Sequence, residues 1–164
     1  MPLQFHPKPG TVVICDFGSG FRAPEMIKRR PAIVVSPQMQ GRPKLCTVVP
    51  ISTKIPLKPM PYHVELVNLK LPYPYQDGPN WVKADMVFAS SFSRLELIRT
   101  GKDSTGKRIY ATECLPAEDI MAVRKAMLYA VGLAALTKHL NSPIQGLSAA
   151  LPRQRDRYLR PPRG

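Results

Sequence analysis

Acidic side chains are scarce in this 164-residue chain, and their scarcity narrows the range of partners. There are 11 Asp and Glu residues against 24 Lys and Arg residues, which gives a formal net charge of +13 at pH 7. Such a charge disfavours cationic partners and favours polyanions such as nucleic acid, anionic lipid or an acidic protein. The hydrophobic fraction of 44% is enough for a packed core. It excludes a wholly disordered chain and fits one domain with an appendage.

Cysteine is also scarce, and long apolar runs are absent. Cys15, Cys46 and Cys114 are odd in number and widely spaced, which argues against a disulfide framework and against a CxxC metal site. We expect reduced, buried thiols. No segment has the long uncharged run needed to span a bilayer, and residues 1–9 contain no signal-peptide core. We therefore expect a cytoplasmic protein with no membrane partner.

Short β-branched and apolar runs, separated by glycine, proline and polar residues, predict a mainly β (α+β) fold. The expected strands are residues 11–17, 31–35, 45–49, 62–66 and 81–87. Residues 94–99 and 107–112 flank the glycine-containing segment 100–106, and we expect a hairpin there. One domain is expected over residues 9–140, preceded by a flexible N-terminus at residues 1–8.

One strong helix is expected near the end of this domain. Pro116 suits a first-turn position, and Glu118 and Asp119 complement the positive end of the helix dipole. The apolar residues in this region recur at helical spacing and predict a face that packs across the sheet. They are Leu115, Ile120, Val123, Met127, Val131 and Leu136.

The composition changes at about residue 141. Prolines and glycines interrupt residues 141–164, and five arginines there outnumber one aspartate. We expect a disordered basic tail. Such a tail either holds polyanions without base specificity or serves only as a solvated segment that keeps the protein soluble.

A basic run leads directly into the second expected strand. Lys28, Arg29 and Arg30 precede it, and the hydroxyl side chains of Ser52 and Thr53 follow the third expected strand. Consecutive strands usually pair, so the polar ends of these two strands can meet. A guanidinium beside two hydroxyls suits a phosphate, because arginine presents a planar fork of donors that stays charged.

The order of elements and several motifs resemble the MazF/PemK family of toxin endoribonucleases from bacterial toxin–antitoxin modules. The motifs are PGTVVICDF (residues 9–17), RPAIVVSP (residues 30–37) and VVPIST (residues 48–53). Weaker support comes from Ala84-Asp85 and from Leu115-Pro116-Ala117-Glu118. The resemblance covers roughly residues 8–134.

This resemblance implies a small SH3-like curved barrel with a C-terminal helix. The family is usually homodimeric and cleaves single-stranded RNA without a metal or other cofactor. Its catalytic arginine falls on Arg30, and its catalytic threonine falls on Ser52, where this chain departs from the pattern and leaves Thr53 as a rival. In some members a glutamate five residues before the arginine contributes, and Glu25 stands at that spacing. The implied inhibitor is an acidic antitoxin that orders on the basic groove.

The chemistry of such a site can be written from the residues. Cleavage of RNA by its own 2′-hydroxyl requires loss of the 2′-proton, stabilisation of charge on the phosphorane and protonation of the leaving 5′-oxygen. Arg30 would neutralise the phosphorane, and Ser52 or Thr53 would donate a hydrogen bond to it. Glu25 is the candidate general base.

Four further residues are candidates for RNA binding. Lys28, Arg29 and Lys54 would contact neighbouring phosphates. Phe21, in a glycine-rich loop, is the candidate for stacking on a base, whereas Trp81 is expected in the core.

Each candidate also has a purely structural interpretation. Arg30 could keep a strand end solvated, and Ser52 and Thr53 could be ordinary turn residues after a proline. Glu25 could form a surface ion pair of little energetic value. The three histidines have no HxH spacing and no neighbouring acids, so a two-histidine ribonuclease mechanism or a metal site is disfavoured. They are His6, His63 and His139.

Two other functions remain open. One is a protein-targeting poison on the same scaffold that resembles CcdB, which acts on DNA gyrase through its C-terminal helix and needs no phosphate site. The other is a non-catalytic RNA- or DNA-binding module whose basic surface and tail supply the affinity.

Overall fold

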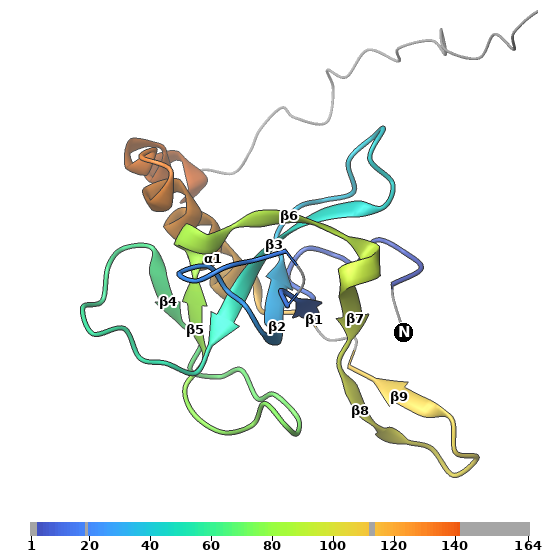
Figure 1. Cartoon of the computed structure of the whole chain (residues 1–164). Helices are drawn as coiled ribbons and strands as arrows, with labels where there is room; N and C mark the ends of the chain where they lie inside the picture. The colour runs from blue at the N-terminus through green and yellow to red at the C-terminus, as the bar shows by residue number, and fades with distance from the viewer. Residues whose placement is uncertain (1–2, 19, 112–113, 142–164) are drawn as a thin grey trace, which may run out of the picture.

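A single antiparallel sheet organises the domain (Figure 1), and β3 lies at its centre. The computed structural model describes residues 3–18, 20–111 and 114–141. Within these ranges the sheet has the order β4-β5-β3-β2-β1-β7, and β6 also pairs with β3. Its strands are β1 (Val12–Asp16), β2 (Arg29–Val34), β3 (Leu45–Ser52), β4 (His63–Glu65), β5 (Trp81–Lys83), β6 (Phe88–Ser91) and β7 (Leu95–Leu97).

The length of β3 lets it pair with strands on both of its edges. One edge pairs with β2, in a register that sets Ala32 opposite Pro50. On the other edge, the first half of β3 pairs with β6 and the last two residues pair with β5, where Ser52 lies opposite Trp81. Near its end, β3 therefore pairs with β2 as far as Pro50 and with β5 at Ile51 and Ser52.

The sheet curves but does not close into a barrel. Its hydrogen-bonded path ends at β4 on one side and at β7 on the other, within the described residues. The mainly β fold with a C-terminal helix is confirmed, and the expected SH3-like curved barrel takes the form of an open sheet. The expected strand at 81–87 is divided, because a 3-10 turn at Ala84–Met86 separates β5 from β6.

A hairpin stands apart from the main sheet, but its first strand lies later than the expected 94–99, because Leu95–Leu97 form β7 and pair with β1. β8 (Arg99–Lys102) pairs with β9 (Arg108–Tyr110) in a two-stranded ribbon. The Asp103 carboxylate closes the turn by accepting hydrogen bonds from the backbone N–H groups of Thr105 and Lys107.

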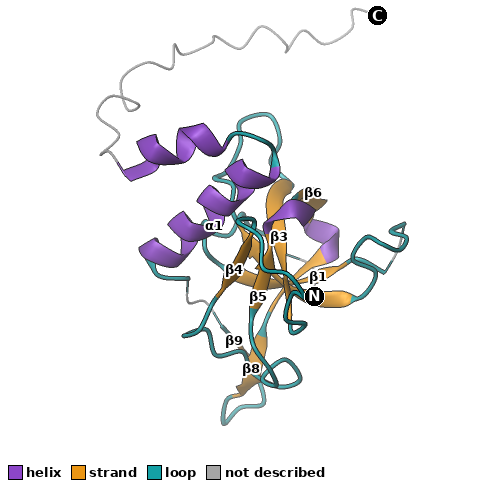
Figure 2. Ribbon diagram, turned by 90° about the vertical axis from the view of Figure 1, so that its left-hand side faces the viewer, coloured by secondary structure: helices purple, strands orange, loops and turns teal. Residues whose placement is uncertain are grey.

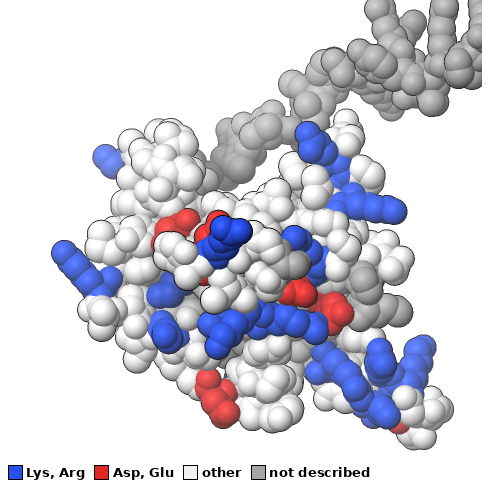
Figure 3. All heavy atoms as spheres, viewed as in Figure 1, with Lys and Arg blue, Asp and Glu red and all other residues white. Residues whose placement is uncertain are grey.

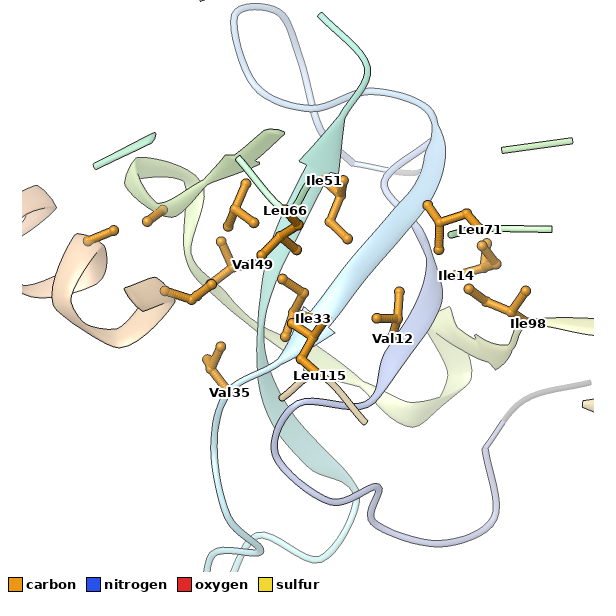
Figure 4. Packing of buried hydrophobic residues seen from close by; sticks show 14 residues of the cluster. Val12, Ile14, Ile33, Val35, Val49, Ile51, Leu66, Leu71, Ile98 and Leu115 are labelled. Carbon is orange, nitrogen blue, oxygen red and sulfur yellow. The ribbon is translucent and has the colours of Figure 1, made fainter. Parts of the chain in front are cut away.

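Both faces of the sheet are covered, which explains the nearly continuous apolar runs in β1, β2 and β3. Successive residues of a strand point to opposite faces. Ile33 and Val49 face a cluster that includes residues of the C-terminal helix (Figure 4), and Val34 and Val48 face a second cluster around Phe17 and Leu95.

The C-terminal helix packs against one face of the sheet (Figure 2). α1 (Ala117–Ala130) buries Val123 and Ala126 in the first cluster, with Ile120 and Met127 beside them. Within the described ranges, no helix is long and apolar enough to cross a bilayer.

The expected apolar stripe is shorter than the sequence indicated. Gly132 follows the helix with a positive φ of 77°, a conformation that ends helices, and a separate 3-10 helix occupies Ala134–Asn141. Val131 and Leu136, expected on the stripe, are therefore 59% and 48% exposed.

Leu3 and Pro7 pack on the domain, within the segment 1–8 that was expected to be flexible and of which the structure describes residues 3–8. Leu3 is buried in the second cluster, and its N–H donates to the carbonyl oxygen of Leu95 over 3.0 Å. Pro7 is also buried. Except for Asn141 at its start, the predicted basic tail lies outside the described residues.

The three thiols occupy two kinds of environment. Cys15 and Cys46 are buried, as expected, but Cys114 is exposed, because it lies in the segment that leads into α1 rather than in a central strand. Burial raises the pKa of both Cys15 and Cys46 to about 11. These two thiols therefore hold their protons at pH 8 and are shielded from reagents.

We expect one fast-reacting thiol in the folded protein at pH 8 and three after unfolding in denaturant. Titration with a chromogenic disulfide reagent measures this directly. Cys114→Ser is the control and should abolish the fast reaction while leaving two thiols in the unfolded chain. A fast reaction that persists in Cys114→Ser would contradict the assignment.

Candidate active site

The ends of β2 and β3 open into a cavity of about 310 Å³, which we call the Arg30 pocket. Three parts of the chain line it. The start of β2 and the residue before it supply Lys28, Arg29, Arg30 and Pro31. The end of β3 supplies Ile51 and Thr53, and the loop between β4 and β5, called the 66–80 loop, supplies Leu71, Pro74, Tyr75, Asp77 and Asn80.

Arg30 lies where the sheet register predicts a meeting with the end of β3. The pairing of β2 with β3 ends at Ala32 and Pro50, and Arg30 and Thr53, just beyond that pair, both line the pocket. The Arg30 side chain is half-buried, and its Nε is buried without a hydrogen-bond partner among the described residues. Arg30 lines the pocket, so its guanidinium brings a positive charge to an anionic ligand there.

The structure separates the two hydroxyl candidates. Thr53 is exposed and lines the Arg30 pocket on the same face of the chain as Ile51. Ser52 is only 6% exposed and does not line the pocket. Its hydroxyl accepts a hydrogen bond from the backbone N–H of Lys54 over 3.2 Å, which is a turn-forming role.

The 66–80 loop folds back on itself to form the far wall of the pocket. The Leu66 N–H donates to the Asn80 carbonyl oxygen over 2.9 Å, and the Asn80 Nδ2 donates to the Leu69 carbonyl oxygen over 2.8 Å. Gly78 has a φ of +95°, and a Cβ built on it would lie 3.4 Å from the Thr53 Cβ. The loop therefore approaches Thr53 closely at a position that favours glycine.

Glu25 lies outside the Arg30 pocket. It lines a second cavity of about 510 Å³, the Phe21 pocket, together with Phe17, Phe21, Pro24, Met26, Asp85, Met86, Val87 and Phe88. The Glu25 carboxylate accepts a hydrogen bond from the Arg22 N–H over 2.7 Å within its own turn. The structure thus does not bring the predicted general base to Arg30 and Thr53.

Phe21 is part of an aromatic cluster rather than a free stacking surface. Its ring lies 5.6 Å from that of Phe17 and 5.3 Å from that of Phe88, both edge-on. The Arg94 guanidinium lies 5.6 Å from its centroid. The prediction that Phe21 stacks on a base stays a prediction, and Trp81, expected in the core, is half-buried.

Cations surround the Arg30 pocket. Arg29 forms an ion pair with Glu96 of β7, with 2.6 Å between Nη2 and Oε2. Lys28 lines the pocket, whereas Lys54 is exposed just beyond it. On the face shown in Figure 3, Lys and Arg side chains form a band across the lower half of the domain and continue on the β8–β9 hairpin at lower right.

The histidines take no part in this pocket. The Nδ1 of His63 accepts a hydrogen bond from the Met60 N–H over 3.2 Å. Burial lowers the pKa of His63, nearby Lys83 lowers it further, and Asp85 opposes the change. Among the described residues, no group of three His, Cys, Asp or Glu side chains is arranged to hold a metal ion.

Sequence reasoning did not find the residues that the 66–80 loop contributes. Tyr75, Asp77 and Asn80 lie between the strands expected at 62–66 and 81–87, where no functional residue was predicted. The sequence could have indicated Asn80 as a pocket residue, because Asn80 directly precedes β5. The pairing of Trp81 with Ser52 brings the start of β5 to the end of β3.

Comparison with known proteins supports one family. Residues 8–130 match the family described as the PemK-like, MazF-like toxin of type II toxin–antitoxin systems. An uncharacterized protein of Haemophilus influenzae (strain Rd) is 30% identical over 145 residues, covering 81% of this chain and 95% of its own. The putative uncharacterized protein YifN of Escherichia coli (strain K12) is 30% identical over 155 residues, covering 83% and 99%.

Solved structures show the same fold. MazF from Deinococcus radiodurans aligns with a TM-score of 0.54 at 23% identity, covering 79% of this chain and 99% of that one. An endoribonuclease from a mycobacterial species, in complex with its cognate antitoxin, aligns with a TM-score of 0.51 at 19% identity, covering 78% and 97%. The matched residues and the 30% identical relatives show that this chain belongs to the PemK-like, MazF-like toxin family of type II toxin–antitoxin systems.

Proposed function

We propose that this toxin is an endoribonuclease that cleaves single-stranded RNA in the Arg30 pocket without a metal ion. One observation carries the proposal. The half-buried Arg30, with an unpartnered buried Nε, lines a pocket that it shares with Lys28, Arg29 and the hydroxyl-bearing Thr53. This is a set of donors and positive charges for a phosphodiester, and Asp77 is the one acid that lines the pocket among the described residues.

In the proposed reaction the ribose 2′-oxygen attacks the adjacent phosphorus. A bond forms between O2′ and phosphorus as the 2′-proton passes to solvent water, and the bond from phosphorus to O5′ breaks as O5′ takes a proton from water. The products are a 2′,3′-cyclic phosphate and a 5′-hydroxyl. Negative charge gathers on the non-bridging oxygens of the phosphorane. Arg30 stabilises that charge, because a guanidinium fixed in a partly desolvated site interacts with it more strongly than one in water.

Thr53 is the hydroxyl that we assign to the phosphate. Thr53 lines the Arg30 pocket, whereas Ser52 is buried and accepts the Lys54 N–H. The departure from the family pattern at Ser52 thus leaves a hydroxyl one residue later.

The basic surface supports two further parts of the proposal. Lys28, Arg29 and Lys54 contact phosphates on either side of the scissile one, in the cytoplasm where mRNA is found. The antitoxin is an acidic segment that covers the same cations, consistent with the net charge of +13. We also propose a homodimer, as the family resemblance implies.

Arg30→Ala should lower kcat for cleavage of a long single-stranded RNA in EDTA by about 100- to 1,000-fold, because the main charge stabilisation is lost. Its expression should no longer arrest growth. Arg42→Ala is the matched control, since it removes the same charge from the exposed turn before β3.

The same assay separates the other functions. RNA retained without cleavage by the wild type would favour a non-catalytic nucleic-acid-binding module. Growth arrest without RNA binding or cleavage, unchanged by Arg30→Ala, would favour a gyrase poison. Undiminished cleavage by Arg30→Ala would overturn the proposed site.

Thr53→Val should lower kcat by at least about tenfold, because it keeps the shape of the side chain and removes the hydroxyl. Ser52→Ala should leave kcat within about threefold of the wild type and act mainly on stability, because its hydroxyl serves the turn. Thermal unfolding of both variants separates the two effects. The reverse order of kcat would place the role on Ser52.

Glu25→Gln should change kcat by less than about threefold, because the Glu25 carboxylate lies outside the Arg30 pocket and accepts a hydrogen bond from the Arg22 backbone N–H. A general base contributes about 100- to 10,000-fold. A loss of that size, together with loss of the acidic limb of the pH–rate profile, would show that RNA binding moves this loop and that Glu25 is the base.

A further inference from the structure

The β8–β9 hairpin carries four cations and one acid over residues 99–110, and no step of the proposed cleavage uses them. The hairpin projects from the domain (Figure 1), and among the described residues its two strands pair only with each other. Its four cations are all exposed: Arg99, Lys102, Lys107 and Arg108. A two-stranded hairpin alone is only marginally stable in water, so folding does not explain a concentration of like charge on it.

The register places the cations of the two strands on one face of the hairpin. Lys102 lies directly opposite Arg108, and Arg99 lies directly opposite Tyr110. Residues that lie opposite each other share a face, and so do residues two apart in one strand, such as Arg108 and Tyr110. The register shift between Arg99 and Gly101 adds one residue to β8 and thereby brings Arg99 to the same face as Lys102. Arg99, Lys102, Arg108 and Tyr110 form what we call the hairpin face.

The charges of the hairpin face repel one another. Like charges directly opposite each other in an antiparallel pair are destabilising, and Lys102 and Arg108 form such a pair. Within the described part of the chain, no acid pairs with Lys102, Lys107 or Arg108. The one acid of the hairpin, Asp103, is engaged in the turn, where its carboxylate accepts the Thr105 hydroxyl over 2.7 Å. A bound polyanion would remove this repulsion.

The base of the hairpin is fixed to the main sheet beside the Arg30 pocket. Ile98, which directly precedes β8, is 3% exposed, and its carbonyl oxygen accepts the Ala111 N–H over 2.8 Å. Two residues before Ile98, Glu96 of β7 forms the ion pair with Arg29, and Arg29 lines the pocket. The band of Lys and Arg side chains in Figure 3 runs from the domain onto the hairpin. An anionic chain that leaves the pocket along this band reaches the hairpin.

Single-stranded RNA fits the hairpin face better than other polyanions do. Its phosphates supply a row of negative charges for the cations, and its unpaired bases can stack on an aromatic side chain. Tyr110, which is half-buried, supplies the aromatic side chain on the same face as the cations. A duplex keeps its bases stacked inside the helix and offers none to Tyr110.

We propose that the hairpin face binds single-stranded RNA beyond the nucleotides held in the Arg30 pocket. Arg99, Lys102 and Arg108 contact phosphates, and Tyr110 stacks on a base. This inference rests on the proposed RNA-cleaving function for its choice of partner. The hairpin face acts on the affinity for long RNA and contacts none of the reacting atoms.

The test uses a double variant of the like-charged pair, Lys102→Gln with Arg108→Gln, which we call the hairpin variant. The matched control is Arg42→Gln with Lys138→Gln. It also removes one exposed Arg and one exposed Lys, from the turn before β3 and from the 3-10 helix Ala134–Asn141, which lie away from the hairpin in Figure 1. Thermal unfolding of the hairpin variant should be no lower than that of the wild type, because the variant removes a repulsion.

The first measurement is equilibrium binding of RNA that carries 2′-O-methyl groups and so cannot undergo attack by its own 2′-oxygen. Wild type should bind a long oligomer more tightly than an oligomer of a few nucleotides, and the hairpin variant should lose about tenfold of this difference at low salt. Its plot of log affinity against log salt should be shallower by about 1.4, since each lost phosphate contact on a single strand contributes about 0.7. The control variant should keep the difference.

The second measurement is cleavage of ordinary RNA in EDTA. The hairpin variant should raise KM for a long RNA about tenfold more than it raises KM for a short one. Binding that depends on the hairpin, without any cleavage by the wild type, would retain the hairpin face and overturn the proposed function. Cleavage by the wild type with equal affinity of both proteins for long RNA would do the reverse.

Three further outcomes would overturn the hairpin face as a site for single-stranded RNA. The first is an equal loss of affinity in the control variant, which would show an effect of net charge alone. The second is tighter, hairpin-dependent binding of a duplex RNA of the same length. The third is retained affinity for RNA with lost affinity for polyglutamate, which would assign the face to an acidic protein.

Discussion

The alternation of side chains along β3 is the constraint on which the rest of this structure depends. β3 pairs with β2 on one edge and with β6 and β5 on the other, so it cannot shift by one residue without exchanging every side chain between two buried clusters. Val49 and Ile51 belong to one cluster, and Cys46 and Val48 belong to the other. Thr53 directly follows the end of β3 and lines the Arg30 pocket together with Ile51.

Most of the sheet could be predicted from the sequence, because its strands are buried on both faces and their β-branched runs are strong signals. A pocket shared by the start of β2 and the end of β3 could also be predicted, since consecutive strands pair. What could not be predicted depends on long-range packing. The open sheet, the burial of Leu3 against Leu95 and the exposure of Cys114 have no local signal.

Loops account for the differences in the candidate site. Spacing alone favoured Glu25, but a loop residue five positions from a strand can lie in many places, and here it bonds to Arg22 within its own turn. Spacing also favoured Ser52 over Thr53, because the family pattern gives only the number of residues after Pro50. It does not say which of the two side chains enters the pocket. The contributions of Tyr75 and Asn80 required the fold of the 66–80 loop, which is made by hydrogen bonds between residues such as Leu66 and Asn80 at its two ends.

The Arg30 pocket draws its walls from two kinds of structure. The cations and Thr53 belong to ends of strands that are fixed by the central sheet, whereas the opposite wall belongs to a loop that joins β4 to β5. Substitutions in this loop would therefore reshape one side of the pocket while leaving the strand ends that supply Arg30 in place. The division allows one wall to diverge during evolution while the hydrophobic core is inherited unchanged.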